Sequence, residues 1–195
     1  MATPPLTVGL LAFARMDLMD LVGPYEVLLT ANRLSARRGH EAPFELVTIG
    51  PGPVRAYGGM TVTPDVTAAD APPLDVLVVP GAIDLDGSRP DPDLAALAPT
   101  TPVLASVCTG AFFLQRTGLL GDRPATTHWE DVPDLTALGV DVRDDVRWVD
   151  AGEVVTSGGI ASGIAMALHL VERFCDRGLA EACAAQIDYV WTESR

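Results

Sequence analysis

The chain has 195 residues, of which 48% are hydrophobic and 20% charged, a balance typical of one compact domain with a substantial core. Its formal net charge is -13 and its 13 basic residues are all arginines, so it lacks the basic character that a nucleic-acid partner requires. No apolar run has the length of a membrane span, and we expect no secretion signal. We therefore predict a single domain over residues 1–195 that binds neither nucleic acid nor membrane.

Five short apolar segments are predicted to be strands. Their continuous apolar character is typical of strands in a parallel sheet that helices cover on both faces. They are residues 6–13, 44–50, 74–81, 102–108 and 152–158. Residues 54–65 and 140–150 alternate more strongly between apolar and polar side chains, and they predict hairpins or an edge strand.

Helical patterns lie between these strands, over residues 24–37, 111–117, 160–174 and 179–191. Pro24 suits the first turn of its helix, and Gly39 suits the end of the same helix. Strands that alternate with helices predict an α/β fold. We expect a three-layer, doubly wound, flavodoxin-like sandwich with a mostly parallel central sheet.

A cysteine stands where one predicted strand gives way to a helix, in the segment Ser106-Val107-Cys108-Thr109-Gly110. A turn that projects its central side chain above the sheet edge crowds the backbone, so it needs small residues two positions to either side, here Ser106 and Gly110. Such a residue is held in strained backbone, and the N-terminus of the following helix favours its thiolate. We interpret Cys108 as a nucleophile at this elbow, rather than a buried structural thiol.

The other two cysteines, Cys175 and Cys183, lie in apolar helical patterns and are expected in the core. Peroxide attacks an activated thiolate before buried thiols, so Cys108 is predicted to oxidise first. An odd count without paired spacing argues against a disulfide framework or a zinc site. We expect a cytoplasmic protein without a metal.

A reactive thiol also needs a proton partner. Asp20 lies just before Gly23-Pro24, in the predicted strand–helix connection where sites form in α/β proteins, and Asp17 is a weaker candidate. His128 follows the helix after Cys108 and is the histidine placed to approach the site.

The remaining histidines have simpler interpretations. His40 follows Gly39 in a predicted loop. His169 falls in an apolar helix, where a hydrogen-bonded core histidine is the expected environment.

Four stretches together resemble the ThiJ/PfpI superfamily, which is related to class I glutamine amidotransferase domains. They are MDLVGPYEVL, DVLVVPG, LASVCTGAFFLQRTGLLGDRPATTHW and VVTSGGIASGIAMALHLVERF, and they span nearly the whole chain. The resemblance implies that Cys108 is the nucleophile, Asp20 its acid/base partner and Thr109 a neighbour in the site. It also implies a homodimer and no cofactor.

Within the superfamily, the chain is most similar to isonitrile hydratase, which adds water to an isocyanide to give an N-substituted formamide, and to the amidase-like sensor domain of AraC-family regulators. Thr109 departs from the Cys-His pair of the protease-like branch, while Ala82 and Ala165 replace a glycine and an aspartate of many relatives. This similarity implies a cofactor-free cysteine hydratase or hydrolase with a small-molecule substrate. The alternatives are a glyoxalase or deglycase, and a non-catalytic ligand- or oxidant-sensing domain.

The substrate pocket is expected around the elbow. The backbone N–H groups of Cys108 and Gly81 are expected to hold polar atoms of the substrate, as oxyanion-hole donors do. The other expected pocket residues are Ala82, Thr109, Gly110 and His128.

Overall fold

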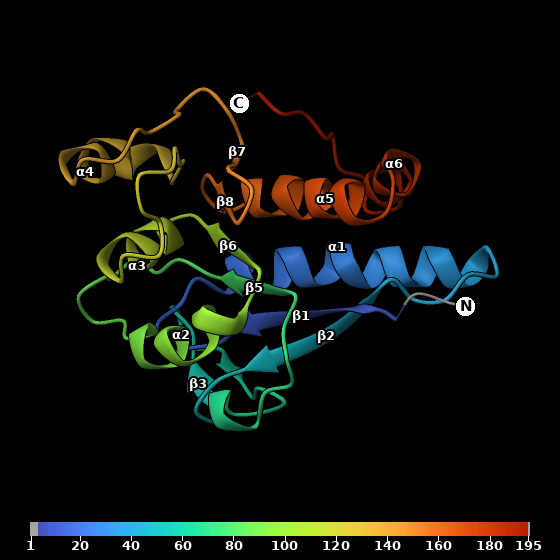
Figure 1. Cartoon of the computed structure of the whole chain (residues 1–195), viewed down its shortest axis with the longest axis horizontal. Coiled ribbons are helices and arrows are strands. Elements are labelled where there is room, and N and C mark those ends of the chain that lie inside the picture. Colours follow the sequence, from blue (N-terminus) through green and yellow to red (C-terminus); the bar gives the residue numbers. More distant parts are fainter. Residues whose placement is uncertain (1–3, 195) are drawn as a thin grey trace.

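A six-stranded sheet forms the centre of the molecule, with the order β2-β1-β5-β6-β8-β7 (Figure 1). The computed structural model describes residues 4–194. The strands of this sheet are β1 (Leu6–Leu11), β2 (Phe44–Ile49), β5 (Val76–Val79), β6 (Val103–Val107), β7 (Trp148–Asp150) and β8 (Val154–Ser157). All neighbours are parallel except β7, which runs antiparallel to β8 at one edge. The predicted mostly parallel sheet is confirmed.

Helices form a layer on each side of this sheet. Helices α1 (Leu18–Arg37), α5 (Ser162–Phe174) and α6 (Arg177–Gln186) pack against one another on one side (Figure 1). From β1 the chain steps to β2 in one direction, and from β5 to β6 in the other. Right-handed crossovers then place α2 (Asp91–Leu97) and α3 (Gly110–Arg116) on the opposite side from α1. The result is the predicted three-layer, doubly wound sandwich.

The central strands explain the continuous apolar runs of the sequence. Every residue of β5 and β6 is buried, because helices cover both faces of the sheet at this point. Residues 54–65 form the predicted hairpin, with β3 (Val54–Arg55) antiparallel to β4 (Thr61–Val62). Among the described residues, no helix combines the length and the apolar character needed to cross a membrane.

Some predicted helix boundaries were wrong. Helix α1 begins at Leu18, where the Asp17 side chain accepts a hydrogen bond from the Met19 N–H at 3.0 Å, so Pro24 lies inside the helix rather than in its first turn. Close packing at Gly23, whose added Cβ would lie 3.2 Å from Ile164 on α5, shows that tertiary contacts support the helix around this proline. Helix α6 ends at Gln186, and Asp188 has a positive φ of 55°. The short α4 (Val132–Ala137) and α2 were not predicted.

Candidate active site

Cys108 lies at the junction of β6 and α3, at the carboxyl edge of the sheet. Its φ is 57°, in the left-handed region, which costs a residue with a Cβ about 1–2 kcal/mol. Two contacts hold the backbone there: the Cys108 N–H donates to the Ser157 carbonyl at 3.1 Å, and the Thr127 hydroxyl donates to the Cys108 carbonyl at 2.9 Å. The strain that the small-residue spacing predicts at this turn is therefore present and supported by neighbouring elements.

A glycine is required directly after this turn. A Cβ on Gly110 would lie 2.4 Å from the carbonyl oxygen of Val79, so α3 starts in contact with the backbone of β5. Gly110 is thus a packing residue, and it is not among the residues that line the cavity at Cys108.

Asp20 reaches the same point from α1, in whose first turn it lies rather than in the predicted connection before the helix. It has no exposed surface, and its Oδ2 accepts a hydrogen bond from the Gly81 N–H at 2.9 Å. Burial, reinforced by the charge of Asp17, raises the pKa of Asp20 to about 8, although the Gly81 N–H and the Cys108 thiol favour its ionised form. Asp20 therefore carries a proton at neutral pH.

The Cys108 thiol is uncharged as well. Burial, followed by the nearby charge of Asp20, raises the pKa of Cys108, while hydrogen bonds from the Thr109 and Ile160 N–H groups act in the opposite direction. Burial therefore favours the thiol over the thiolate that the sequence predicted. Asp20 Oδ1 is buried without a partner of full hydrogen-bond geometry among the described residues, so a proton on this oxygen can face the sulfur.

The predicted oxyanion donors are already occupied. The Gly81 N–H is bonded to Asp20, and the Cys108 N–H to the carbonyl groups of Ser157 and Gly158. The prediction that these two N–H groups hold substrate atoms is therefore wrong. The N–H groups of Thr109 and Ile160 are directed at the sulfur instead.

Thr109 joins two loops of the site. Its hydroxyl accepts a hydrogen bond from the Ala82 N–H and donates one to the Ala82 carbonyl, both at 2.8 Å. The loop that Thr109 holds also carries Gly81, where an added Cβ would lie 2.6 Å from the Thr109 hydroxyl and 2.9 Å from Asp20 Oδ2. Thr109 thus positions the peptide that holds the acid.

Thr109→Val is expected to lower the free energy of unfolding by about 1–3 kcal/mol, because it leaves the buried N–H and carbonyl of Ala82 without these hydrogen bonds. Thr109→Ser keeps the hydroxyl and is the matched control. Chemical denaturation of the two variants measures the difference. Equal stability of the valine and serine variants would contradict the positioning role.

A cavity of about 190 Å³ opens above Cys108. Its lining residues are Asp17, Ala82, Ile83, Cys108, Thr109, His128, Glu130, Asp131 and Ile160. Ala82, Thr109 and His128 were predicted here, whereas Gly81 lies behind the lining. Ile83, Glu130, Asp131 and Ile160 were missed; the three-residue spacing of His128 and Asp131 was a signal that these two side chains meet.

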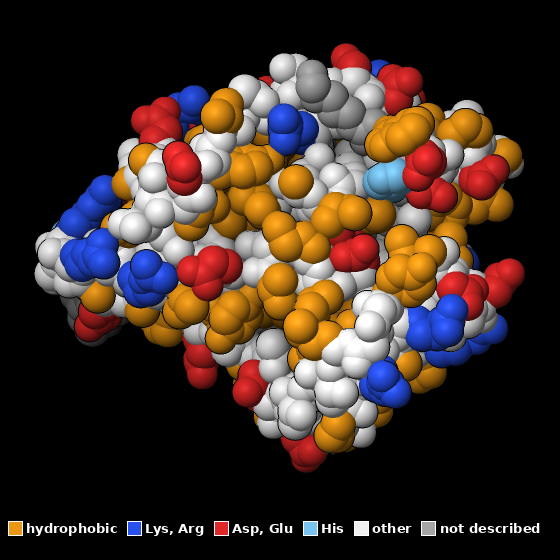
Figure 2. All heavy atoms as spheres, turned by 180° about the vertical axis from the view of Figure 1, so that it is seen from behind, with side chains coloured by type: hydrophobic (Ala, Val, Ile, Leu, Met, Phe, Trp, Pro, Cys, Tyr) orange, Lys and Arg blue, Asp and Glu red, His pale blue; other side chains and the backbone are white. Residues whose placement is uncertain are grey.

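His128 is held at the rim of this cavity by acidic neighbours. Its Nδ1 lies 3.3 Å from Asp131 Oδ2 and 3.7 Å from Glu130 Oε2. The ring packs on Gly159, where an added Cβ would lie 1.9 Å from a ring carbon, so only glycine leaves space for it. On the face of the molecule in Figure 2, a histidine with acidic side chains beside it borders an area where hydrophobic side chains gather.

The cysteines differ from the prediction in one respect. Cys183 is buried as expected, but Cys175, the first residue after α5, is exposed. The reason for predicting that Cys108 oxidises first therefore does not hold. Cys108 is more deeply buried than Cys175, and this burial raises the pKa of the Cys108 thiol.

We now expect dilute peroxide at neutral pH to oxidise Cys175 before Cys108, because an exposed thiol with a smaller pKa increase provides more accessible thiolate. Peptide mass spectrometry at low oxidant dose ranks the three cysteines. Modification of Cys108 ahead of Cys175 would show that the site activates its thiol despite the burial.

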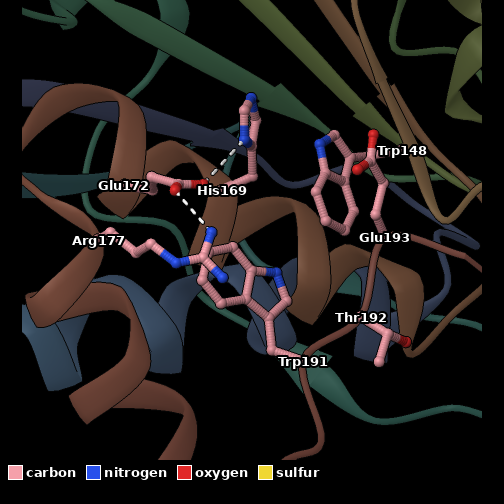
Figure 3. A pocket seen from close by; sticks show the side chains of 7 residues that line it. All are labelled: Trp148, His169, Glu172, Arg177, Trp191, Thr192 and Glu193. Atoms are coloured by element: carbon pink, nitrogen blue, oxygen red, sulfur yellow. Dashed lines mark hydrogen bonds and ion pairs between the residues drawn. The ribbon is translucent and has the colours of Figure 1, made fainter.

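A second cavity, of about 260 Å³, lies beside His169 and Glu172 in the second half of α5 (Figure 3). It shares none of its lining residues with the Cys108 cavity. The Trp148 ring stacks on the His169 ring, with 5.4 Å between their centroids, and on the Trp191 ring, with 6.2 Å between their centroids. The guanidinium carbon of Arg177 lies 5.3 Å from the centroid of the Trp191 ring. His169 Nε2 lies 2.7 Å from Asp150 Oδ2. His169 is thus hydrogen-bonded as predicted, but it is half-buried near the surface, in a stack that anchors the segment after α6.

Comparison with known proteins gives the family. The sequence model of the DJ-1/PfpI family matches residues 7–173. The chain belongs to the DJ-1/PfpI family. This membership confirms the resemblance seen in the sequence, and the solved structures agree on the fold: a ThiJ/PfpI family protein from Pseudomonas syringae has a TM-score of 0.81 at 24% identity, covering 96% of this chain and 76% of that chain.

Two curated relatives of this chain have different names. Isonitrile hydratase from Pseudomonas putida is 33% identical over 189 residues, covering 94% of this chain and 78% of that protein. The HTH-type transcriptional regulator GbdR from Pseudomonas aeruginosa is 30% identical over 190 residues, covering 95% of this chain and 51% of the regulator. The chain is therefore similar both to an enzyme and to about half of a regulator's length.

Proposed function

We propose that this DJ-1/PfpI protein is a cofactor-independent cysteine hydratase that converts an isocyanide and water to an N-substituted formamide. The observation that carries the proposal is the buried pair of the Asp20 carboxyl and the Cys108 thiol beneath the cavity, where burial raises the pKa of both groups and so favours their protonated forms. The terminal carbon of an isocyanide has no leaving group and must gain a proton as the nucleophile adds. A neutral acid beside a thiol suits that reaction, and the 33% identity to isonitrile hydratase supports the assignment.

In the first step, the Cys108 sulfur bonds to the isocyanide carbon while Asp20 delivers its proton to that carbon. The thiol proton passes to the Asp20 carboxylate, so the acid is restored and a neutral thioimidate forms. Asp20 does not line the cavity, but a carbon bonded to the sulfur comes within its reach. The Gly81 N–H keeps the carboxyl oriented for this transfer.

In the second step, water adds to the thioimidate carbon, with Asp20 taking a water proton and returning one to nitrogen. The carbon–sulfur bond of the resulting adduct breaks, the thiol regains its proton, and the formamide leaves. The sum is one isocyanide plus one water, so no redox partner or cofactor enters the balance. The Thr109 and Ile160 N–H groups beside the sulfur are the donors that meet polar atoms of the adduct.

Turnover is expected to fall about tenfold per pH unit as the pH rises above about 8, because Asp20 then loses the proton that the first step needs. A pH–rate profile of isocyanide hydration measures this. A rate that increases with pH through the same range would instead identify the ionised pair as the active form.

A substrate screen tests the function itself. Isocyanides, methylglyoxal and simple amides are incubated with the wild type and with Cys108→Ser, and Cys175→Ser serves as a control for an exposed thiol outside the site. Isocyanide hydration that is lost only in Cys108→Ser supports the proposal. Turnover of methylglyoxal alone would replace it with glyoxalase or deglycase chemistry.

The non-enzymatic alternative is a sensing domain, favoured by the 30% identity to a regulator. Saturable binding of an isocyanide or another small ligand without any turnover would support it against the hydratase. The homodimer and the cytoplasmic location expected from the sequence stay predictions.

A further inference from the structure

The walls of the Cys108 cavity carry charge of one sign. Among the described residues that line it, three are carboxylates, Asp17, Glu130 and Asp131, and none is an arginine. They come from two places: Asp17 caps the start of α1, and Glu130 and Asp131 are consecutive residues that follow Trp129. The net charge of the whole chain, -13, has the same sign.

This negative field reaches the reacting atom. The charge of Asp131 contributes to the raised pKa of Cys108, and that of Asp17 to the raised pKa of Asp20. The carboxylates of the lining thus disfavour negative charge at the Cys108 sulfur and at the Asp20 carboxyl. His128 is the one basic side chain of the lining, and its Nδ1 already faces Asp131 at 3.3 Å.

The uncharged part of the lining is apolar. Ile83 is 59% exposed and Ile160 38% exposed, so both offer hydrophobic surface to a ligand that enters. The cavity volume of about 190 Å³ is below the roughly 300–1,000 Å³ of typical ligand pockets, which limits the ligand to a small molecule.

We propose that the Cys108 cavity selects small substrates that are uncharged or positively charged, and that it rejects substrates carrying a carboxylate or another anionic group. An anion would meet three carboxylates at a partly desolvated site and no arginine with which to pair. A neutral apolar group would pack on Ile83 and Ile160. A cation would be attracted by the carboxylates that line the cavity. The inference rests on the proposed function only in taking Cys108 as the residue that the substrate meets.

The test uses thiol reagents that need no turnover. Three methanethiosulfonates, carrying a methyl, a 2-sulfonatoethyl or a 2-(trimethylammonio)ethyl group, each transfer their thioalkyl group to a cysteine and release methanesulfinate. Peptide mass spectrometry follows Cys108 and the exposed Cys175 in the same molecule, and rates are normalised to free cysteine. We expect the ratio of cationic to anionic rates to be about tenfold or more higher at Cys108 than at Cys175.

Variants that remove a negative charge test whether Glu130 and Asp131 cause the preference for the cationic reagent. Glu130→Gln, at a side chain 64% exposed, should lower the ratio at Cys108, and adding Asp131→Asn should lower it further. Glu41→Gln, an exposed change outside the cavity, should leave the ratio unaltered. Equal normalised ratios at Cys108 and Cys175, or a Cys108 that none of the three reagents modifies, would overturn the proposal.

A second measurement separates this inference from the proposed function. Isocyanoacetate and its methyl ester differ chiefly by one negative charge, so hydration of the ester but not of the anion is expected. If neither is hydrated, the hydratase proposal fails while the reagent ratios still decide the charge selectivity. Equal hydration of both would overturn the selectivity and leave the hydratase standing.

Discussion

Asp20→Asn is expected to make the protein more stable at neutral pH and to remove most of the proposed isocyanide hydration. The carboxyl has a pKa of about 8 in the folded protein against 3.8 for an ordinary aspartate, so the wild type must take up a proton to fold at pH 7. Asparagine is neutral throughout and its side-chain oxygen can still accept from the Gly81 N–H. The gain has an upper bound of about 4 kcal/mol at pH 7.

The sign of the pH dependence follows from the raised pKa of Asp20. Between about 4 and about 8 the folded state binds one proton more than the unfolded state, so the stability of the wild type falls as the pH rises and levels off above about 8. Asp20→Asn lacks this slope. Chemical denaturation at several pH values should therefore show a difference that grows from acidic pH toward about pH 8.

The same substitution at Asp65 is a matched control. Hydrogen bonds from the Thr48 hydroxyl and N–H lower the pKa of Asp65, so Asp65→Asn is expected to lose stability at neutral pH, where Asp20→Asn gains it. Asp65 lies outside the Cys108 cavity and its substitution should leave hydration intact. Full hydration by Asp20→Asn would refute the acid/base role of Asp20 and make His128 the next candidate.

Gly110→Ala is expected to lower the free energy of unfolding by about 3 kcal/mol or more. The added Cβ would lie 2.4 Å from the Val79 carbonyl oxygen and 3.1 Å from that of Pro80. These are backbone atoms at the end of a buried strand, so α3 and β5 must separate to admit the methyl group. The turn that holds Cys108 would move with α3.

A glycine at the start of another helix provides the control for this change. In Gly178→Ala, the atom nearest to the new Cβ is Asp176 Oδ1 at 3.1 Å, and this flexible side chain needs to shift by only a few tenths of an ångström, which keeps its hydrogen bond from the Leu179 N–H. Its stability should stay within about 1 kcal/mol of the wild type. Chemical denaturation compares the two variants, and a loss below about 1 kcal/mol in Gly110→Ala would show that the contact of α3 with β5 is less strict than the structure indicates.

Local patterns in the sequence were sufficient for the fold and for the position of the cysteine. Continuous apolar strands indicated a sheet covered on both faces, because only such a sheet buries every side chain of β5 and β6. The small residues around Cys108 indicated the strained turn, because a close approach such as that of Gly110 to Val79 excludes a Cβ. The start of α1 was missed because Pro24 suggested a helix start, although Asp17 provides the cap.

The protonation of the site was decided only by the tertiary structure. Asp20 and Gly81 are 61 positions apart, and Thr109 and Ala82 are 27 apart, so no local pattern shows that their N–H groups and side chains are already paired. The sequence predicted a thiolate from the helix after Cys108, whereas burial raises the pKa values of both Cys108 and Asp20. Burial depends on how distant elements pack, and for this reason the charge state of the pair follows from the fold rather than from the residues beside it.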